Sequence, residues 1–208
     1  LTTIPSIDVV AEYKEVEEEI IVTAAKRESR IEDLPMSVQA ITGSRLDDAG
    51  VNDFMVYAEL IPTLSYIQYG PGRSAFYLRG TSDGNFGNLA GPNTTVAMYI
   101  DESPINTVGV NPDLHIYDME RIEVLNGPQG TLYGAGSVGG TVRFIPNKPS
   151  YEEETIDLQA QMSSTSHSSD SNYDFNVTAN IPMSDTLAFR GTFGHQKLGG
   201  FIDAVGLV

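Results

Sequence analysis

Strict alternation between apolar and polar residues in the last third of the sequence is the feature that most restricts its fold. From Asn172 to Ile181 every second residue is apolar, and Thr155–Met162 shows the same pattern. Leu187, Phe189 and Phe193 continue it. Because successive side chains of a β-strand point to opposite faces, the pattern predicts about three antiparallel strands, each with one apolar face.

These predicted strands have the dimensions of membrane strands. Ten residues at about 3.3 Å each, tilted by about 40°, rise roughly 25 Å, the height of the apolar band of an outer-membrane barrel. A polar loop at Ser163–Ser171 and a short turn at Pro182–Thr186 separate them, as long and short connections alternate in such barrels. A soluble hairpin sheet packed on a core is the alternative, but nothing else in the chain supplies a surface for it. Three strands cannot close a barrel and lipid tolerates no open sheet edge, so we expect a fragment of a longer protein.

Residues 26–150 predict a small α+β domain, placed between a flexible segment at 1–25 and the barrel strands at 151–208. Ser44 and Asn52 are expected to cap two short helices, the second of which stops at Pro62. Gly and Pro are concentrated in the loops, which favours a turn-rich architecture. The expected strands are Met36–Ile41, Leu64–Gln68, Ala75–Arg79, Thr95–Ile100, Arg121–Leu125 and Thr141–Ile145.

The N-terminal segment combines acidic and β-prone stretches. Residues 1–19 carry several acidic side chains and little to bury, so we expect them to be extended and mobile. The run Ile20–Ala24 follows and is flanked by charged residues on both sides. Such a run is either an ordinary edge strand or a strand that a partner protein binds by β-augmentation.

Composition excludes several classes of function. No stretch reaches the roughly 18 apolar residues of a membrane helix. The absence of cysteine excludes disulfides and thiol catalysis. The net charge of −16 argues against nucleic acid as a partner, because few cations are present to replace its counterions.

Two motifs suggest chemistry but lack the required context. Gly134–Gly139 spells G-x-G-x-x-G, yet a strand at Thr141–Ile145 follows where a dinucleotide site needs a helix. His115, His167 and His195 are far apart, and none has a companion at metal-ligand spacing. We therefore predict no catalytic residue, no metal site and no cofactor, and we do not expect an enzyme.

Several stretches together resemble TonB-dependent outer-membrane receptors of bacteria. Met119–Gly134 is close to the family sequence "IERIEVLRGPQGTLYG", and Gly139–Ile145 completes this plug signature. One departure is Asn126, which stands where the family has arginine, whereas an earlier plug arginine, Arg79, is kept. Further stretches that resemble the family's Ton box and early plug strands are Glu19–Ala24, Asp33–Val38, Phe76–Gly80 and Val96–Asp101.

The resemblance implies a plug domain followed by the first strands of a large transmembrane β-barrel of about 22 strands. It implies TonB-dependent import of a scarce nutrient across the outer membrane, either a ferric siderophore or similar chelate, or an oligosaccharide. A signalling or surface-binding receptor without transport, and a soluble β-rich binding module, are the alternatives.

The resemblance also implies partners and site residues. TonB, energised by ExbB and ExbD, would bind Glu19, Ile20, Ile21, Val22, Thr23 and Ala24. Plug–barrel contacts are expected at Arg79, Arg121 and Glu123. The ligand would meet outward loops at Tyr69, Arg73, Asn85, Phe86, Asn88 and Asn106, although each of these residues could equally be only a turn former. Outer-membrane lipid and the remainder of the barrel complete the expected surroundings.

Overall fold

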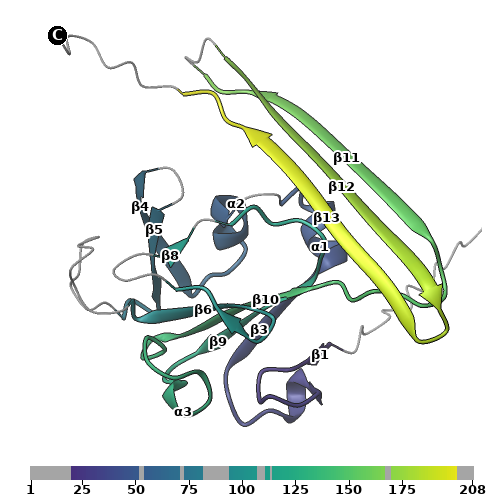
Figure 1. Cartoon of the computed structure of the whole chain (residues 1–208). Coiled ribbons are helices and arrows are strands. Elements are labelled where there is room, and N and C mark those ends of the chain that lie inside the picture. Colours follow the sequence, from purple (N-terminus) through teal and green to yellow (C-terminus); the bar gives the residue numbers. More distant parts are fainter. Residues whose placement is uncertain are drawn as a thin grey trace, which may run out of the picture.

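The computed structural model describes residues 20–51, 54–70, 73–81, 94–106, 111–112, 114–166 and 170–200. Two parts are visible, a mixed body of short strands and helices and a sheet of three long strands beside it (Figure 1). None of the described helices is long and apolar enough to cross a membrane.

A five-stranded sheet forms the centre of the mixed body. β9 (Met119–Asn126) and β10 (Gly140–Pro146) form its middle and pair antiparallel, while β10 and β6 (Val96–Ile100) pair parallel. Both central strands are almost completely buried. One face of the pair is apolar and joins the main core through Ile122, Val124, Val142 and Phe144, whereas the opposite face includes the charged Arg121, Glu123 and Arg143. In spatial order the strands are β3 (Val38–Thr42), β9 (Met119–Asn126), β10 (Gly140–Pro146), β6 (Val96–Ile100) and β7 (Ser103–Pro104).

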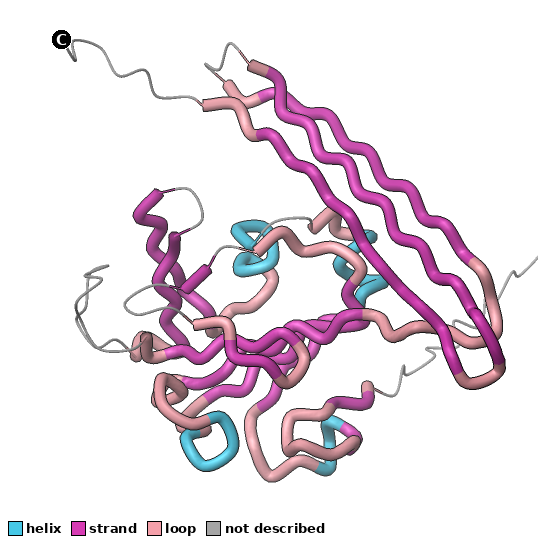
Figure 2. Tube along the Cα trace, in the orientation of Figure 1, coloured by secondary structure: helices cyan, strands magenta, loops and turns pink. Residues whose placement is uncertain are grey.

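Smaller elements surround this sheet (Figure 2). A second sheet consists of β4 (Leu64–Gly70), β5 (Arg73–Leu78) and β8 (Asn111–Pro112). A two-stranded ribbon consists of β1 (Ile21–Val22) and β2 (Ser29–Arg30). The helices are the 3-10 turn η1 (Ile31–Asp33) and the short α1 (Gly43–Asp48), α2 (Phe54–Glu59) and α3 (Gly130–Tyr133).

The start of α1 differs from the sequence-based prediction. Thr42, not Ser44, is the N-cap residue, and the two hydroxyl oxygens lie 3.1 Å apart. The reason is close packing at Gly43, where an added Cβ would lie 2.1 Å from the carbonyl oxygen of Met119. The helix therefore starts at the residue that can approach β9. Asn52, the second predicted cap, lies outside the described residues.

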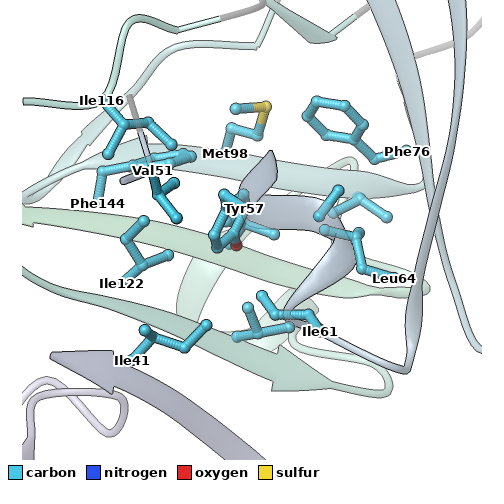
Figure 3. Packing of buried hydrophobic residues seen from close by; sticks show 14 of the residues in the cluster. Ile41, Val51, Tyr57, Ile61, Leu64, Phe76, Met98, Ile116, Ile122 and Phe144 are labelled. Carbon is cyan, nitrogen blue, oxygen red and sulfur yellow. The ribbon is translucent and has the colours of Figure 1, made fainter. Parts of the chain in front are cut away.

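The main hydrophobic core lies between the five-stranded sheet and α2 (Figure 3). Tyr57 of α2 and Ile61, just after that helix, pack toward the sheet residues Met98, Ile122 and Phe144. The rings of Tyr57 and Phe144 are 5.9 Å apart and tilted. The helical spacing of Tyr57 and Ile61 thus places both residues in the core, although α2 ends at Glu59.

The three long strands form an antiparallel meander of β11 (Thr155–Ser164), β12 (Ser171–Ser184) and β13 (Leu187–Lys197). The predicted alternation is confirmed: apolar Leu158 and Phe193 are 70% and 68% exposed, whereas polar Asn176 is 1% exposed. The turn after β12 is shorter than predicted, because that strand continues to Ser184. The sheet is therefore apolar on its outer face and polar on the face that meets the mixed body.

Candidate functional site

The predicted TonB-binding segment, here called segment 20–24 after its described residues, lies against the mixed body. Ile21 and Val22 form β1 and pair with Arg30 and Ser29 of β2. The N–H of Ile31 donates to the carbonyl oxygen of Ile20 at 3.1 Å. Glu19 lies outside the described residues.

Alternate side chains of this segment point inward. Val22 and Ala24 have no exposed surface and contact a second apolar cluster that includes Leu125 and Tyr133. Tyr133 donates its hydroxyl proton to the carbonyl oxygen of Ala24 at 2.7 Å. Burial raises the pKa of Tyr133 to about 12, so this donor stays protonated at neutral pH. Ile21, in contrast, is 46% exposed.

A buried group of charges lies directly under Thr23. Glu123 has no exposed surface and accepts hydrogen bonds from the Thr23 N–H at 2.8 Å, Arg121 Nε at 2.8 Å and Arg143 Nη1 at 2.6 Å. Arg143 Nη1 also donates to the Thr23 hydroxyl at 2.8 Å. Buried charges are tolerated when they are paired and hydrogen-bonded, and here part of that pairing comes from the N-terminal segment.

Glu102 connects this group to Lys26. It accepts from Arg143 Nη2 at 2.8 Å and forms an ion pair with the Lys26 ammonium, which also lies 4.5 Å from the ring centroid of Tyr133. The hydrogen bond from Lys26 is the main reason why the pKa of Glu102 is lowered, and the charge of Arg143 adds to it. The side chain of Glu102 is 54% exposed, so this carboxylate is reachable from solvent.

A second polar group joins the mixed body to the long strands. Asp118, in a turn with φ of +57°, accepts two hydrogen bonds from Arg190 at 2.6 and 2.9 Å and one from Thr192 at 3.0 Å. Burial alone would raise the pKa of Asp118, but hydrogen bonds from Arg190, Asn147 and Thr192 lower it overall. His115 lies 2.8 Å from Asp174 of β12.

The contacts of Asp118 and His115 with the long strands were not predicted from the sequence. A partial signal was available, because Arg190 and Thr192 occupy the polar positions of an alternating strand and therefore need partners on that side. The identity of those partners depends on how the mixed body sits against the sheet, which no local pattern encodes.

The residues predicted at the plug–barrel contact have other partners in the described structure. Arg121 and Glu123 point into the charge group under Thr23, and Glu123 has no surface left for a further contact. Arg79 is exposed, has φ of +52° and donates to Ser37 Oγ at 2.8 Å. Its contact with a barrel wall stays a prediction.

Asn126, the departure from the family pattern, is buried at the end of β9. Its N–H donates to the carbonyl oxygen of Ser37 at 2.9 Å. Within the described residues its side-chain amide has no hydrogen-bond partner. Ser37 thus lies between Asn126 and Arg79.

Of the predicted ligand-facing side chains, the structure describes only that of Asn106. Its oxygen accepts from the Met98 N–H at 2.5 Å, and its nitrogen donates to Thr94 Oγ1 at 2.7 Å and the Val96 carbonyl at 3.0 Å. In this structure Asn106 therefore fastens a loop to β6. Tyr69 and Arg73 are described by their backbone alone, in β4 and β5, and Asn85, Phe86 and Asn88 lie outside the described residues.

Comparison with known proteins identifies the mixed body. The family described as TonB-dependent Receptor Plug Domain matches residues 30–141, more than half of the chain. The ferripyoverdine receptor of Pseudomonas aeruginosa is 35% identical over 132 residues, which cover 64% of this chain and 15% of that protein. The pesticin receptor of Yersinia pestis is 32% identical over 136 residues, 64% of this chain and 19% of that protein. This chain thus matches less than a fifth of the length of either relative.

Solved structures share the fold. The ferric yersiniabactin uptake receptor of Yersinia pestis superposes with a TM-score of 0.63 at 24% identity, covering 77% of this chain and 24% of that one. The pyoverdine outer-membrane receptor of Pseudomonas aeruginosa, bound to pyoverdine, gives a TM-score of 0.65 at 23% identity, covering 85% and 24%.

Proposed function

Because this chain belongs to the TonB-dependent receptors, we propose that its full-length protein imports a ferric siderophore across the bacterial outer membrane. The observation that carries the proposal is the polar face of β12 packed against the plug, opposite an apolar exposed face. A plug inside a membrane barrel requires this arrangement, because the lumen is polar and the outer surface contacts lipid. The names of two relatives, receptors for ferripyoverdine and for ferrioxamine B, favour a ferric siderophore over an oligosaccharide.

We further propose that TonB binds segment 20–24. Segment 20–24 and the short turn between β12 and β13 lie at one end of the molecule, and the tips of β4 and β5 lie toward the other end (Figure 1). Short barrel turns face the periplasm, so the segment is on the side from which TonB approaches. Pairing through the main chain suits a segment with ordinary apolar side chains, because backbone hydrogen bonds supply much of the affinity.

The family match and the long strands together support a division of the chain into three parts. We propose a TonB-binding segment within residues 1–25, a plug at 26–150 and barrel strands from 151 onward. The family match at 30–141 lies inside the proposed plug. The proposed barrel part contains β11, β12 and β13.

The test separates binding from transport. Val22→Pro in the full-length receptor removes a backbone donor and fixes φ in the segment that TonB would pair with. Ferripyoverdine, ferric yersiniabactin and ferrioxamine B, each carrying radioactive iron, are offered to cells that lack their own receptors. For the ligand that the parent imports, Val22→Pro should keep cell-surface binding and lose uptake to the level of a strain without TonB.

Glu28→Pro, in the exposed connection between β1 and β2, is the matched control and should transport normally. Unchanged uptake by Val22→Pro would contradict the assignment of segment 20–24. Failure of the parent to bind any of the three ligands would contradict the proposed substrates.

A further inference from the structure

Segment 20–24 cannot accept a partner strand while it is docked as described. Two of its side chains, Val22 and Ala24, are fully buried. Its backbone is engaged at Ile20 by Ile31, at Thr23 by Glu123 and at Ala24 by Tyr133. A protein that adds a strand to this segment must therefore bind a conformation in which these contacts are broken.

The charges that hold the segment differ greatly in their access to solvent. Glu123 and Arg143 are buried, and Lys26 is one-third exposed. Glu102 is the most exposed charge in direct contact with Lys26 or Arg143. It bridges the residue that follows the segment, Lys26, and the core residue that contacts Thr23, Arg143. Loss of this one carboxylate would leave Lys26 without its ion pair and Arg143 without one of its two carboxylate partners.

Glu102 lies in the turn of the β6–β7 hairpin, and backbone or side-chain hydrogen bonds fasten this hairpin both at its turn and at its base. Asp101 in the same turn has φ of +53°, and its N–H donates to the Phe144 carbonyl at 2.8 Å. Two residues after β7, Asn106 bonds to β6 at Val96 and Met98 and to Thr94 before it. The hairpin thus runs from the charge group that holds segment 20–24 to a residue of a predicted ligand-facing loop.

We propose that the β6–β7 hairpin is a latch on segment 20–24: Glu102 holds the segment through Lys26 and Arg143, and Asn106 keeps the hairpin turn in position. This inference rests on the proposed function, since it specifies how availability of the TonB-binding segment is controlled. A ligand that binds more tightly when Asn106 is detached from β6 shifts the population toward the released segment. Reciprocally, release of the segment favours binding of that ligand.

The experiment measures release directly in the full-length receptor. These 208 residues contain no cysteine, so Val22→Cys provides a thiol that is buried when the segment is docked. Its rate of reaction with a water-soluble maleimide reports the undocked population, and the receptor with Val22 intact corrects for any thiol elsewhere. Adding Glu102→Gln should raise the rate about tenfold or more, because a charge-assisted hydrogen bond and an ion pair are lost.

The matched control is Glu32→Gln, which removes another exposed ion pair of the same region, with Arg30. It should leave the labelling rate within about twofold, as expected for a surface pair. An unchanged rate in Glu102→Gln, or an equal increase in Glu32→Gln, would overturn the latch.

A double-mutant cycle tests the role of Asn106. Asn106→Ala should also raise the labelling rate. The fold-increase of the double variant with Glu102→Gln should be smaller than the product of the two single fold-increases. Full multiplication of the two effects would show that Asn106 and Glu102 act independently and would overturn the hairpin link. Unchanged heat-modifiable mobility in gel electrophoresis verifies that each variant is folded.

A separate binding measurement distinguishes this inference from the proposed function. The affinity of the purified TonB C-terminal domain should rise in Glu102→Gln in parallel with the labelling rate. Faster labelling without tighter TonB binding would support the latch as a hold on the segment and contradict TonB as its partner.

Discussion

The two large sheets of this chain distribute polarity in opposite ways. In the plug, β9 and β10 bury consecutive residues, and the face that they turn to the main core is apolar, with Ile122, Val124, Val142 and Phe144. In β12, buried and exposed positions alternate, and the buried ones are the polar Asp174, Asn176, Thr178 and Asn180. The plug sheet therefore follows the rule of a protein folded in water, and the long sheet follows the rule of a membrane barrel.

The contact between the plug and the long strands also differs in kind from the packing within the plug. Where the plug meets the long strands, the described contacts are hydrogen bonds and ion pairs such as those of Asp118 with Arg190 and Thr192. Within the plug, apolar packing around Phe144 and Ile122 dominates. A polar contact can exchange its partners for water at low cost, whereas an apolar core cannot. Apolar packing thus holds the plug together, whereas its described contacts with the long strands are polar.

The largest expected effect comes from the same substitution, phenylalanine to alanine, made at one position in each sheet. Phe144→Ala should lower the free energy of unfolding of the plug by about 3–5 kcal/mol, because it removes a fully buried ring and leaves a cavity. Phe193→Ala makes the same chemical change on the exposed outer face of β13 and should leave plug stability within about 0.5 kcal/mol. Urea unfolding of the detergent-solubilised full-length receptor measures both. Equal losses would mean that the outer face of β13 packs against protein.

The next effect tests the two faces of β11. Leu158→Arg places a charge on the apolar outer face and should cost up to about 2–4 kcal/mol, depending on depth in the bilayer. Gln159→Arg, one residue further, points to the polar side and should cost much less. The yield of heat-stable, membrane-inserted receptor measures the difference.

A residue of β12 would be a poor control, because Asn176 is 1% exposed and donates hydrogen bonds to Asp174 and Gln159. An arginine there would collide with the plug. Better insertion of Leu158→Arg than of Gln159→Arg would show that the register of the sheet is inverted.

The smallest of the three effects concerns the polar contact between the sheets. Asp118→Asn removes the charge that Arg190 and Thr192 bind and should weaken the attachment of the plug by about 1.5–3 kcal/mol. Asp170→Asn, which breaks an exposed pair with Lys197, should cost less than about 1 kcal/mol. Protease accessibility of the plug in urea ranks the two variants. Equal protection would contradict a structural role for Asp118.

This contact also has a defined pH dependence. The folded protein lowers the pKa of Asp118 below its ordinary value of 3.8. Its stabilisation is therefore fully present above pH 3.8 and is lost as the pH falls through the lowered value. Acid should detach the plug in the parent over this range and have a smaller effect in Asp118→Asn.

The sequence predicted the parts of this structure that depend on local repeats. The period-two pattern in 155–193 fixes the face of every residue in β11, β12 and β13, since a shift by one position would reverse them all. The strands predicted at Arg121–Leu125 and Thr141–Ile145 similarly match β9 and β10 to within two residues at each end. The predicted start of α1 was wrong, because the helix begins at Gly43, which packs closely against the backbone of β9.

The charge group under Thr23 was not predicted, because it is assembled from distant positions. Glu123 and Arg143 face each other across the β9–β10 pair, so their contact follows once the register is known. Thr23 is 100 residues away from Glu123 and joins through β1, a strand of two residues. Strands this short carry no periodic signal, and the docking of segment 20–24 is visible only in three dimensions.

The central claim is that one face of β12 contacts lipid while the other contacts the plug, and it can be measured residue by residue. Spin labels are placed singly from 172 to 181 in the full-length receptor in lipid bilayers, and their collision rates with oxygen, which concentrates in lipid, are recorded. The account predicts high rates at Tyr173, Phe175, Val177, Ala179 and Ile181 and low rates at the positions between them. A uniform profile, or high rates at the even-numbered positions, would contradict a barrel wall closed around the plug.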